Sequence, residues 1–460
     1  MIICGVEDIF TPHMCVKRQS CRNTYTIYPS KGRIAMKLAE MSREELSAFK
    51  AECEKEYNDY KAKGMKLDMS RGKPSTAQLD LAMPMFDVFT NAASMLTVDG
   101  IDCRNYGCLT GIHDAKILFG DLLGVKEEEL IIGGNSSLAM MYDTIARAMT
   151  HGVYESDKPW GKYDKIKFLC PVPGYDRHFA ICEHFGIEMI PVPMSPTGPD
   201  MDMIEKLVSE DDTIKGIWCV PLYSNPDGIS YSDETVRRFA NLSPKADDFR
   251  IFWDNAYCVH HLTDNPDKIL NILDECKKTG KEDMVFIFAS TSKISFSGAG
   301  IAIMAGSVSN MKHITKLMGI QCISYDKINQ LRHVKYFKNV DGIMAHMAKH
   351  REIIAPKFDL VLDMLNKDIK ELDVLDWNHP NGGYFISVNT LEGCAKRVVE
   401  LCKEAGVVLT SAGATFPYGK DPADRNIRIA PTFPPLEELE AAMKIFCVSV
   451  KLASAEKLLA

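Results

Sequence analysis

The stretch MVFIFASTSK, residues 284–293, decides the fold that this sequence predicts. Its apolar half, residues 284–288, is typical of a buried strand in a parallel sheet. Small hydroxyl residues and then Lys293 follow at the C-terminal end of that strand, where open α/β sheets bind their ligands. The small residues 297–300 and a second apolar run come next. Lys293 is therefore enclosed by apolar segments, although burying an ammonium group is costly.

A lysine in such a place can lose its charge by forming a Schiff base with an aldehyde. We therefore interpret Lys293 as the attachment site of pyridoxal phosphate (PLP). The alternative, a solvent-exposed lysine at the end of a strand, has roughly half the weight on this motif alone. The choice between the two depends on the rest of the chain.

The composition is that of an acidic globular protein. The chain has 460 residues, enough for two or three domains, with 46% hydrophobic and 25% charged residues and a formal net charge of -8. It has no stripe of Lys and Arg and no run of the ~20 apolar residues that a membrane helix needs, so we expect neither nucleic-acid nor membrane binding. The 15 cysteines are scattered without CxxC spacing, which predicts free thiols, no metal site and a cytoplasmic location.

Four segments are expected along the chain. Residues 1–35 show no clear period and no secretory-signal pattern, so we expect a poorly ordered N-terminal extension, with an alternative start at Met36. Residues 36–84 should form a helix, opened by a capping box, and an arm that packs on the small domain. Residues 85–330 should form a large PLP-binding domain, and residues 331–460 a small C-terminal domain.

The fold class follows from the order of the elements. Between about residue 130 and residue 290, short apolar strands alternate with amphipathic helices such as residues 137–149, which predicts an α/β fold with a mainly parallel sheet covered on both faces. After about residue 325, long helices lead to strands of antiparallel character. This change predicts a smaller α+β domain.

Two loops at the ends of predicted strands could hold the charged ends of PLP. The run GGNSS, residues 133–137, lies between a strand and a helix, where backbone N–H groups, the helix dipole and two serine hydroxyls favour a phosphate. A capped helix start explains this run about as well. Asp254 directly follows an apolar strand, so its carboxylate needs a cation, and the protonated pyridine nitrogen of PLP is one. A helix N-cap is the common alternative for Asp254.

Two further motifs bring polar side chains to strand ends. Asn225 lies in an Asn-Pro-x-Gly turn, where its amide could hydrogen-bond the ring hydroxyl of PLP beside the hydroxyl of Tyr257, although such turns are ordinary chain reversals. Arg428 lies between apolar strand residues and needs an anionic partner. A guanidinium can fork onto the carboxylate of an amino-acid substrate. A structural salt bridge is the alternative.

The order of these motifs resembles that of the class I aminotransferases, which are fold-type I PLP enzymes, over about residues 66–450. The runs RGKPS at 71–75, CPVPGYDRHF at 170–179, WDNAY at 253–257 and NIRIAP at 426–431 are similar to the bacterial aspartate aminotransferases of subgroup Ic, described as MocR-like aminotransferases without a DNA-binding domain. The resemblance implies a fold-type I transferase with a mainly parallel sheet of the seven-stranded type. It also implies a homodimer that passes an amino group between aspartate and 2-oxoglutarate.

The resemblance assigns roles in cofactor binding and catalysis. Lys293 would form the Schiff base, and Asp254 would pair with the pyridine nitrogen. Asn225 and Tyr257 would contact the ring hydroxyl, and Tyr175 would stack on the ring. The phosphate would be lined by Asn135, Ser136, Ser137, Ser290 and Ser292.

The resemblance also implies contacts beyond these. Tyr106 falls where a tyrosine of the family reaches the phosphate of the neighbouring subunit, so each site would need both chains. Arg428 would bind the substrate α-carboxylate, with Asn225 and the backbone of Gly72 nearby. Residues 297–300 stand where many class I aminotransferases have an arginine that pairs with the phosphate. Hydroxyl and backbone groups should therefore contribute more to phosphate binding in this chain.

Substrate specificity depends on the residue that binds the distal carboxylate. The candidate is Arg177, at a helix start two residues after Tyr175; a solvated helix arginine is the alternative, and Arg332 is a weaker candidate. Transaminases for alanine, kynurenine, 2-aminoadipate or aromatic donors share most of these residues. A non-catalytic effector sensor with the same fold is a further alternative, against which Lys293 and the missing DNA-binding module both count.

Overall fold

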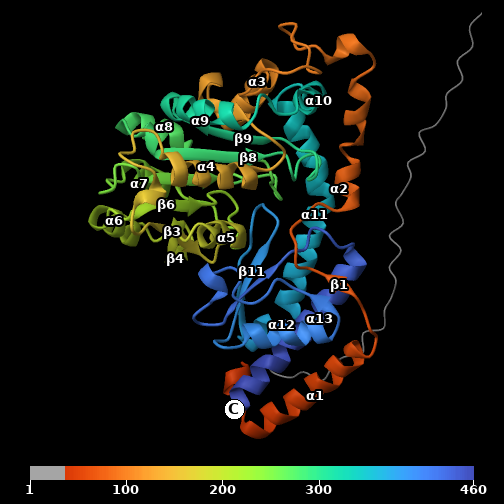
Figure 1. Cartoon of the computed structure of the whole chain (residues 1–460). Coiled ribbons are helices and arrows are strands. Elements are labelled where there is room, and N and C mark those ends of the chain that lie inside the picture. Colours follow the sequence, from red (N-terminus) through yellow and green to blue (C-terminus); the bar gives the residue numbers. More distant parts are fainter. Residues whose placement is uncertain (1–36) are drawn as a thin grey trace, which may run out of the picture.

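The structure is a computed structural model that describes residues 37–460, so the extension expected at residues 1–35 lies outside the described residues. A large and a small sheet organise the chain, and helix α11 (Val340–Asp368) runs from the level of the one to that of the other (Figure 1). None of the helices in the described part combines the length and the apolar character that a membrane span requires.

The large sheet has eight strands. In spatial order they are β2 (Leu130–Ile132), β9 (Ala302–Gly306), β8 (Val285–Ser290), β7 (Arg250–Asp254), β6 (Ile214–Cys219), β3 (Lys167–Val172), β4 (Glu188–Ser195) and the two-residue β5 (Gly198–Pro199). The five strands from β8 to β4 are parallel to one another. The expectation of a mainly parallel sheet is therefore confirmed.

Strands β9 and β5 run against this pattern. β9 is antiparallel to both β8 and β2, and β5 is antiparallel to β4. The connection from β8 to β9, residues 291–301, contains no helix, whereas a parallel crossover needs about a dozen residues or more and is usually helical. Lys293 lies in this short connection, directly beyond the C-terminal end of β8.

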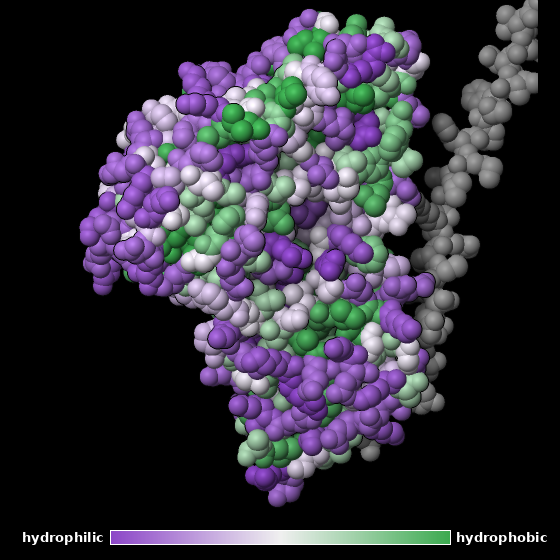
Figure 2. Space-filling model, in the orientation of Figure 1, coloured by the Kyte–Doolittle hydropathy of each residue, from purple (hydrophilic) through white to green (hydrophobic). Residues whose placement is uncertain are grey.

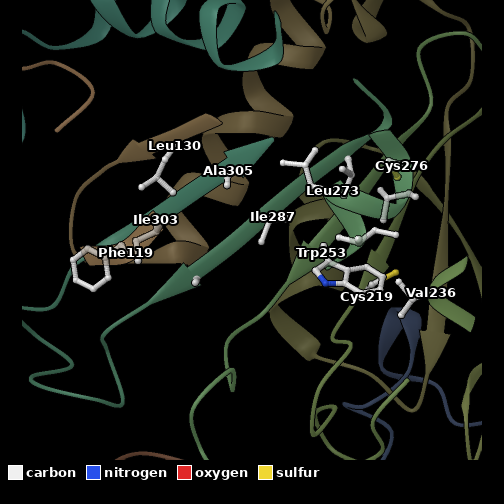
Figure 3. Packing of buried hydrophobic residues seen from close by; sticks show 14 of the residues in the cluster. Phe119, Leu130, Cys219, Val236, Trp253, Leu273, Cys276, Ile287, Ile303 and Ala305 are labelled. Atoms are coloured by element: carbon white, nitrogen blue, oxygen red, sulfur yellow. The ribbon is translucent and has the colours of Figure 1, made fainter. Parts of the chain in front are cut away.

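Successive strand residues point to opposite faces of the large sheet, and helices cover both of these faces. On the face of Trp253 the core includes residues from α3 (His113–Leu123), α6 (Met201–Glu210), α7 (Asp233–Asn241), α8 (Ile272–Thr279) and α10 (Lys327–Phe337). On the opposite face it includes residues from α4 (Ser137–His151), α5 (Asp176–His184) and α9 (Val308–Gln321). Figure 3 shows Trp253 and Ile287 packed with Leu273 of α8 and Val236 of α7. Since both faces are covered, ligands can reach the sheet only at its edge.

The small sheet has the antiparallel order β10 (Leu375–Trp377), β11 (Ile386–Thr390) and β13 (Asn426–Ile429). It shares a hydrophobic core with α11, α12 (Ala395–Glu404) and α13 (Leu436–Leu459). Helix α1 (Arg43–Lys61) packs against α13, and β1 (Leu67–Asp68) pairs with β12 (Val407–Val408). The chain from α1 to β1 thus lies beside the small sheet, and α2 (Thr76–Asp80) follows on the way to the large one.

Candidate active site

A cavity of about 490 Å³ lies between the C-terminal edge of the large sheet and the small sheet. Residues from both sides line it. The predicted site residues among them are Gly72, Ser137, Tyr175, Arg177, Asn225, Asp254, Tyr257, Lys293 and Arg428. The structure therefore brings these residues, which are spread over more than three quarters of the chain, around one space.

Asp254 and Lys293 enter the cavity from neighbouring parallel strands. Asp254 ends β7, and Lys293 follows β8. Asp254 is 3% exposed, and its Oδ1 is buried without a hydrogen-bond partner among the described residues. Burial lowers the pKa of Lys293, and the nearby Asp254 opposes this shift. The site therefore combines an amine of reduced basicity with a buried acceptor oxygen.

His178 fixes the carboxylate of Asp254, a role that was not predicted from the sequence. Its Nε2 lies 3.1 Å from Asp254 Oδ2, and its ring stacks on Trp218 with centroids 4.4 Å apart and planes 9° from parallel. Because an imidazole N–H donates to Oδ2, Oδ1 is the oxygen that remains for a ligand. The position of His178 three residues after Tyr175, on the same face at a helix start, is the signal that could have revealed it.

Three polar side chains surround the space between Asp254 and Lys293. Burial raises the pKa of Tyr257 well above its ordinary value and that of Tyr175 to about 12. Both phenols therefore stay protonated at neutral pH and can donate hydrogen bonds. Asn225 is 5% exposed, and its Oδ1 accepts a hydrogen bond from Arg428 Nη1 at 3.1 Å.

Arg428 projects from β13 of the small sheet into the cavity. Its guanidinium carbon lies 4.7 Å from the ring centroid of Phe385. The same ring requires a glycine at position 72, because a Cβ added there would lie 2.4 Å from it. Arg428 also forms an ion pair with Asp176, whose Oδ1 lies 3.0 Å from Nη1.

The residues predicted for the phosphate lie together beside the cavity, and of these only Ser137 lines it. Ser136 caps α4, since its hydroxyl accepts the N–H of Ala139 at 3.3 Å. The Ser292 hydroxyl donates to the Asn135 carbonyl at 3.4 Å, which joins the loop before α4 to the loop of Lys293. Ser290 ends β8. The dipole of α4 and the hydroxyl groups favour an anion at this place.

Tyr106 and Arg332 lie away from the cavity. Tyr106 is 78% exposed, on a loop that Lys327 holds through the carbonyls of Asn105 and Gly107. The Arg332 guanidinium lies 5.0 Å from the centroid of the Phe86 ring and does not line the cavity. Arg177 does line it, with a side chain that is 58% exposed.

A chain of buried polar groups supports the backbone of Lys293. The Tyr384 hydroxyl lies 3.5 Å from the Lys293 carbonyl and accepts the Gln78 amide at 2.9 Å. The same amide lies 3.1 Å from His350 Nδ1, and His350 Nε2 lies 3.1 Å from His346. Burial is the main cause that lowers the pKa of His350 to about 4.

This low pKa of His350 predicts a loss of stability in mild acid. The unfolded chain takes up the proton near the ordinary pKa of 6.5, whereas the folded chain takes it up only near 4. The contribution of His350 to the free energy of unfolding is therefore fully present above pH 6.5. It is lost as the pH drops from 6.5 to about 4, and the loss is on the order of 3 kcal/mol. Urea unfolding at a series of pH values measures the effect.

The variant His350→Gln should show a weaker pH dependence of the unfolding free energy between pH 6.5 and 4.5. The matched control is His379→Gln, since His379 is exposed and should leave this slope as in the wild type. Equal slopes in all three proteins would show that His350 is not the group responsible.

Comparison with known proteins places the chain among the aminotransferases. The family model described as aspartate amino-transferase matches residues 41–460. An aspartate aminotransferase of Corynebacterium glutamicum is 43% identical over 422 residues, which cover 92% of this chain and 97% of that protein.

Solved structures show the same relationship. The crystal structure of an aspartate transaminase from Corynebacterium glutamicum matches with a TM-score of 0.90 at 42% identity, over 92% of this chain and 100% of that one. The α-aminoadipate aminotransferase LysN of Thermus thermophilus, solved with N-(5'-phosphopyridoxyl)-L-leucine, matches with a TM-score of 0.70 at 16% identity, over 87% of this chain and 95% of that one. The second likeness shows the fold alone.

Proposed function

The chain belongs to the aspartate amino-transferase family, and on that premise we propose that it is a PLP-dependent aspartate aminotransferase. It would transfer the amino group of L-aspartate to 2-oxoglutarate and release oxaloacetate and L-glutamate. The relative from Corynebacterium glutamicum, named an aspartate aminotransferase, supports this substrate pair. The runs RGKPS and PVPGYDRHF further support a place in subgroup Ic. All cysteines in the described part of the chain are free thiols, which fits a cytoplasmic location.

The buried Oδ1 of Asp254 is the observation that carries the proposal. A buried carboxylate oxygen without a partner among the described residues is costly, and a protonated pyridine nitrogen would satisfy both its charge and its hydrogen bond. Lys293 lines the same cavity and offers the amine that holds a carbonyl cofactor. When bound, PLP supplies an electron sink for the charge that develops at the substrate Cα.

The side chains of this cavity would divide the remaining work. Lys293 would remove the proton from the substrate Cα and deliver a proton to the former aldehyde carbon of the cofactor, and its lowered pKa increases the share of neutral amine at neutral pH. Asn225 and Tyr257 would orient the ring hydroxyl of the cofactor. Arg428 would bind the α-carboxylate of the substrate, and the loop before α4 would bind the cofactor phosphate.

We also propose a homodimer in which Tyr106 completes the site of the partner. The exposure of Tyr106 supports this, because its ring is offered to another chain rather than to its own cavity. Other large apolar side chains are exposed in the described part, at Met83, Phe86, Val98 and Ile320. Apolar residues gather in Figure 2 along the edge near α2, which fits a surface that another subunit covers.

The division of the chain into a large domain at 85–330 and a small one at 331–460 is likewise a proposal. The two sheets have separate hydrophobic cores, which supports two domains, and α10, which spans residue 330, contributes Leu331 and Phe337 to the core of the large sheet. The cavity would then lie between two bodies, with Arg428 on one side and Asp254 on the other.

Arg177 is the proposed ligand of the distal carboxylate. Replacing it with alanine should raise the KM for aspartate about 10- to 100-fold, because a charge-assisted hydrogen bond to the second carboxylate is lost. The KM for alanine, which has no such group, should change little. Steady-state assays with both donors measure the difference.

The matched control for this variant is Arg237→Ala. Arg237 is an exposed arginine on α7, paired with Asp233 away from the cavity, and its loss should leave both KM values as in the wild type. A similar rise in KM for aspartate and alanine in Arg177→Ala would move the distal-carboxylate role to another residue.

A panel of amino donors with 2-oxoglutarate tests the function as a whole. Aspartate should give the highest kcat/KM, with oxaloacetate and glutamate formed in equal amounts. A higher kcat/KM with alanine, kynurenine, 2-aminoadipate or an aromatic donor would show that aspartate is not the preferred amino donor. Absence of transfer from every donor would contradict the proposed enzyme.

A further inference from the structure

The guanidinium of Arg428 already holds a carboxylate of this chain. Its Nη1 donates to Asp176 Oδ1 at 3.0 Å and to Asn225 at 3.1 Å, and its Nη2 donates to the Thr410 hydroxyl at 3.3 Å. Its Nε is buried without a partner among the described residues. A ligand carboxylate that forks across the end of the guanidinium pairs with Nη1 and Nη2, and Asp176 occupies the first of these nitrogens.

Asp176 comes from the opposite side of the cavity. It is the first residue of α5, whereas Arg428 lies in the middle of β13. The side chain of Arg428 is 8% exposed and that of Asp176 is 32% exposed. Of the two partners, Asp176 is thus the one that can turn toward water, and its Oδ2 lies 4.0 Å from the Nε of Arg177.

A substrate α-carboxylate cannot bind Arg428 through both nitrogens while Asp176 is bound there. A carboxylate that forks onto a guanidinium uses two parallel N–H groups, and two carboxylates on one cation repel each other at such short range. The contact between Asp176 and Arg428 must therefore break before the substrate carboxylate forms its full pair of hydrogen bonds.

We propose that the Asp176 carboxylate is an internal competitor for the substrate α-carboxylate: it occupies Arg428 in the free site, and the substrate displaces it on binding. The inference rests on the proposed function, since it concerns the same substrate site. Asp176 keeps the buried guanidinium neutralised between turnovers, at the cost of affinity for every ligand that binds through a carboxylate. Asp176 is thus an affinity-setting residue of the substrate site.

Calorimetric titration of the PLP-loaded protein with succinate, an unreactive dicarboxylate, tests this role. The variant Asp176→Asn keeps the size of the side chain but removes its charge. We expect it to bind succinate about five- to tenfold more tightly than the wild type, because the ligand no longer displaces an anion. A residue with only a structural role would not tighten binding when it is replaced.

The matched control is Asp202→Asn. Asp202 also lies in the first turn of a helix and pairs with an arginine, Arg238, at 2.6 Å, but away from the cavity. Its replacement should leave the Kd for succinate unchanged. Tighter binding in Asp176→Asn alone supports the proposal, and an unchanged or weaker affinity in that variant overturns it.

The same titration separates this inference from the proposed function. If the wild type takes up PLP and binds succinate but Asp176→Asn gains nothing, only the role of Asp176 is wrong. If the wild type takes up no PLP or binds no succinate, the proposed function fails and the inference fails with it.

Discussion

Replacing Lys293 with alanine is expected to abolish transamination while the protein stays folded. The amine is the group that lines the cavity beside the substrate Cα in the proposed function, and general-base work of this kind contributes about 10²–10⁴-fold in rate. Loss of the attachment point for the cofactor adds to this effect. Steady-state assays with aspartate and 2-oxoglutarate, together with circular dichroism, measure activity and fold.

The matched control is Lys73→Ala. Lys73 lines the same cavity, but its Nζ lies 3.8 Å from the ring centroid of Phe433, and no part of the proposed chemistry uses it. This variant should keep its activity within about tenfold of the wild type. Full turnover by Lys293→Ala would show that Lys293 is neither the base nor the attachment point of the cofactor.

Replacing Asp254 with asparagine should lower kcat by at least about 10²–10³-fold, the usual scale for losing one preorganised electrostatic contact in an active site. Asparagine has the same shape and can still accept a hydrogen bond from His178. It carries no negative charge, however, and cannot hold a protonated ring nitrogen, so the electron-withdrawing character of the cofactor would be lost. Stopped-flow and steady-state kinetics on the PLP-loaded variant measure the change.

Asp227→Asn is the comparison for this variant. Asp227 is a second buried aspartate at the same edge of the sheet, and it is 6% exposed. Burial raises its pKa to about 6. It does not line the cavity that contains Asp254 and Lys293. Activity should stay near the wild-type level there. A comparable loss of activity in both variants would show that the effect comes from disturbed packing rather than from the charge of Asp254.

Much of the site could be predicted from the sequence because its chemistry is local. Parallel strands end at one edge, so Asp254 at the end of β7 and Lys293 after β8 had to become neighbours once the strands were recognised. Asn225 and Arg428 carried their own signals, an Asn-Pro turn and a cation within an apolar run.

Contacts between distant segments could not be predicted in this way. The pairing of His178 with Asp254 depends on how α5 rests on the sheet, and the pairing of Asp176 with Arg428 depends on where the small sheet meets that helix. No local pattern encodes either. The antiparallel direction of β9 was not predicted either, although the connection after β8 is too short for the usual parallel crossover.

If Asp254 and Lys293 hold opposite ends of one cofactor ring, a crystal structure of the PLP-loaded protein will show this arrangement. We expect density that is continuous from Lys293 Nζ to the cofactor, with the ring nitrogen about 2.7–3.2 Å from Asp254 Oδ1. Cofactor attached to another lysine, or a ring whose nitrogen faces away from Asp254, would contradict it.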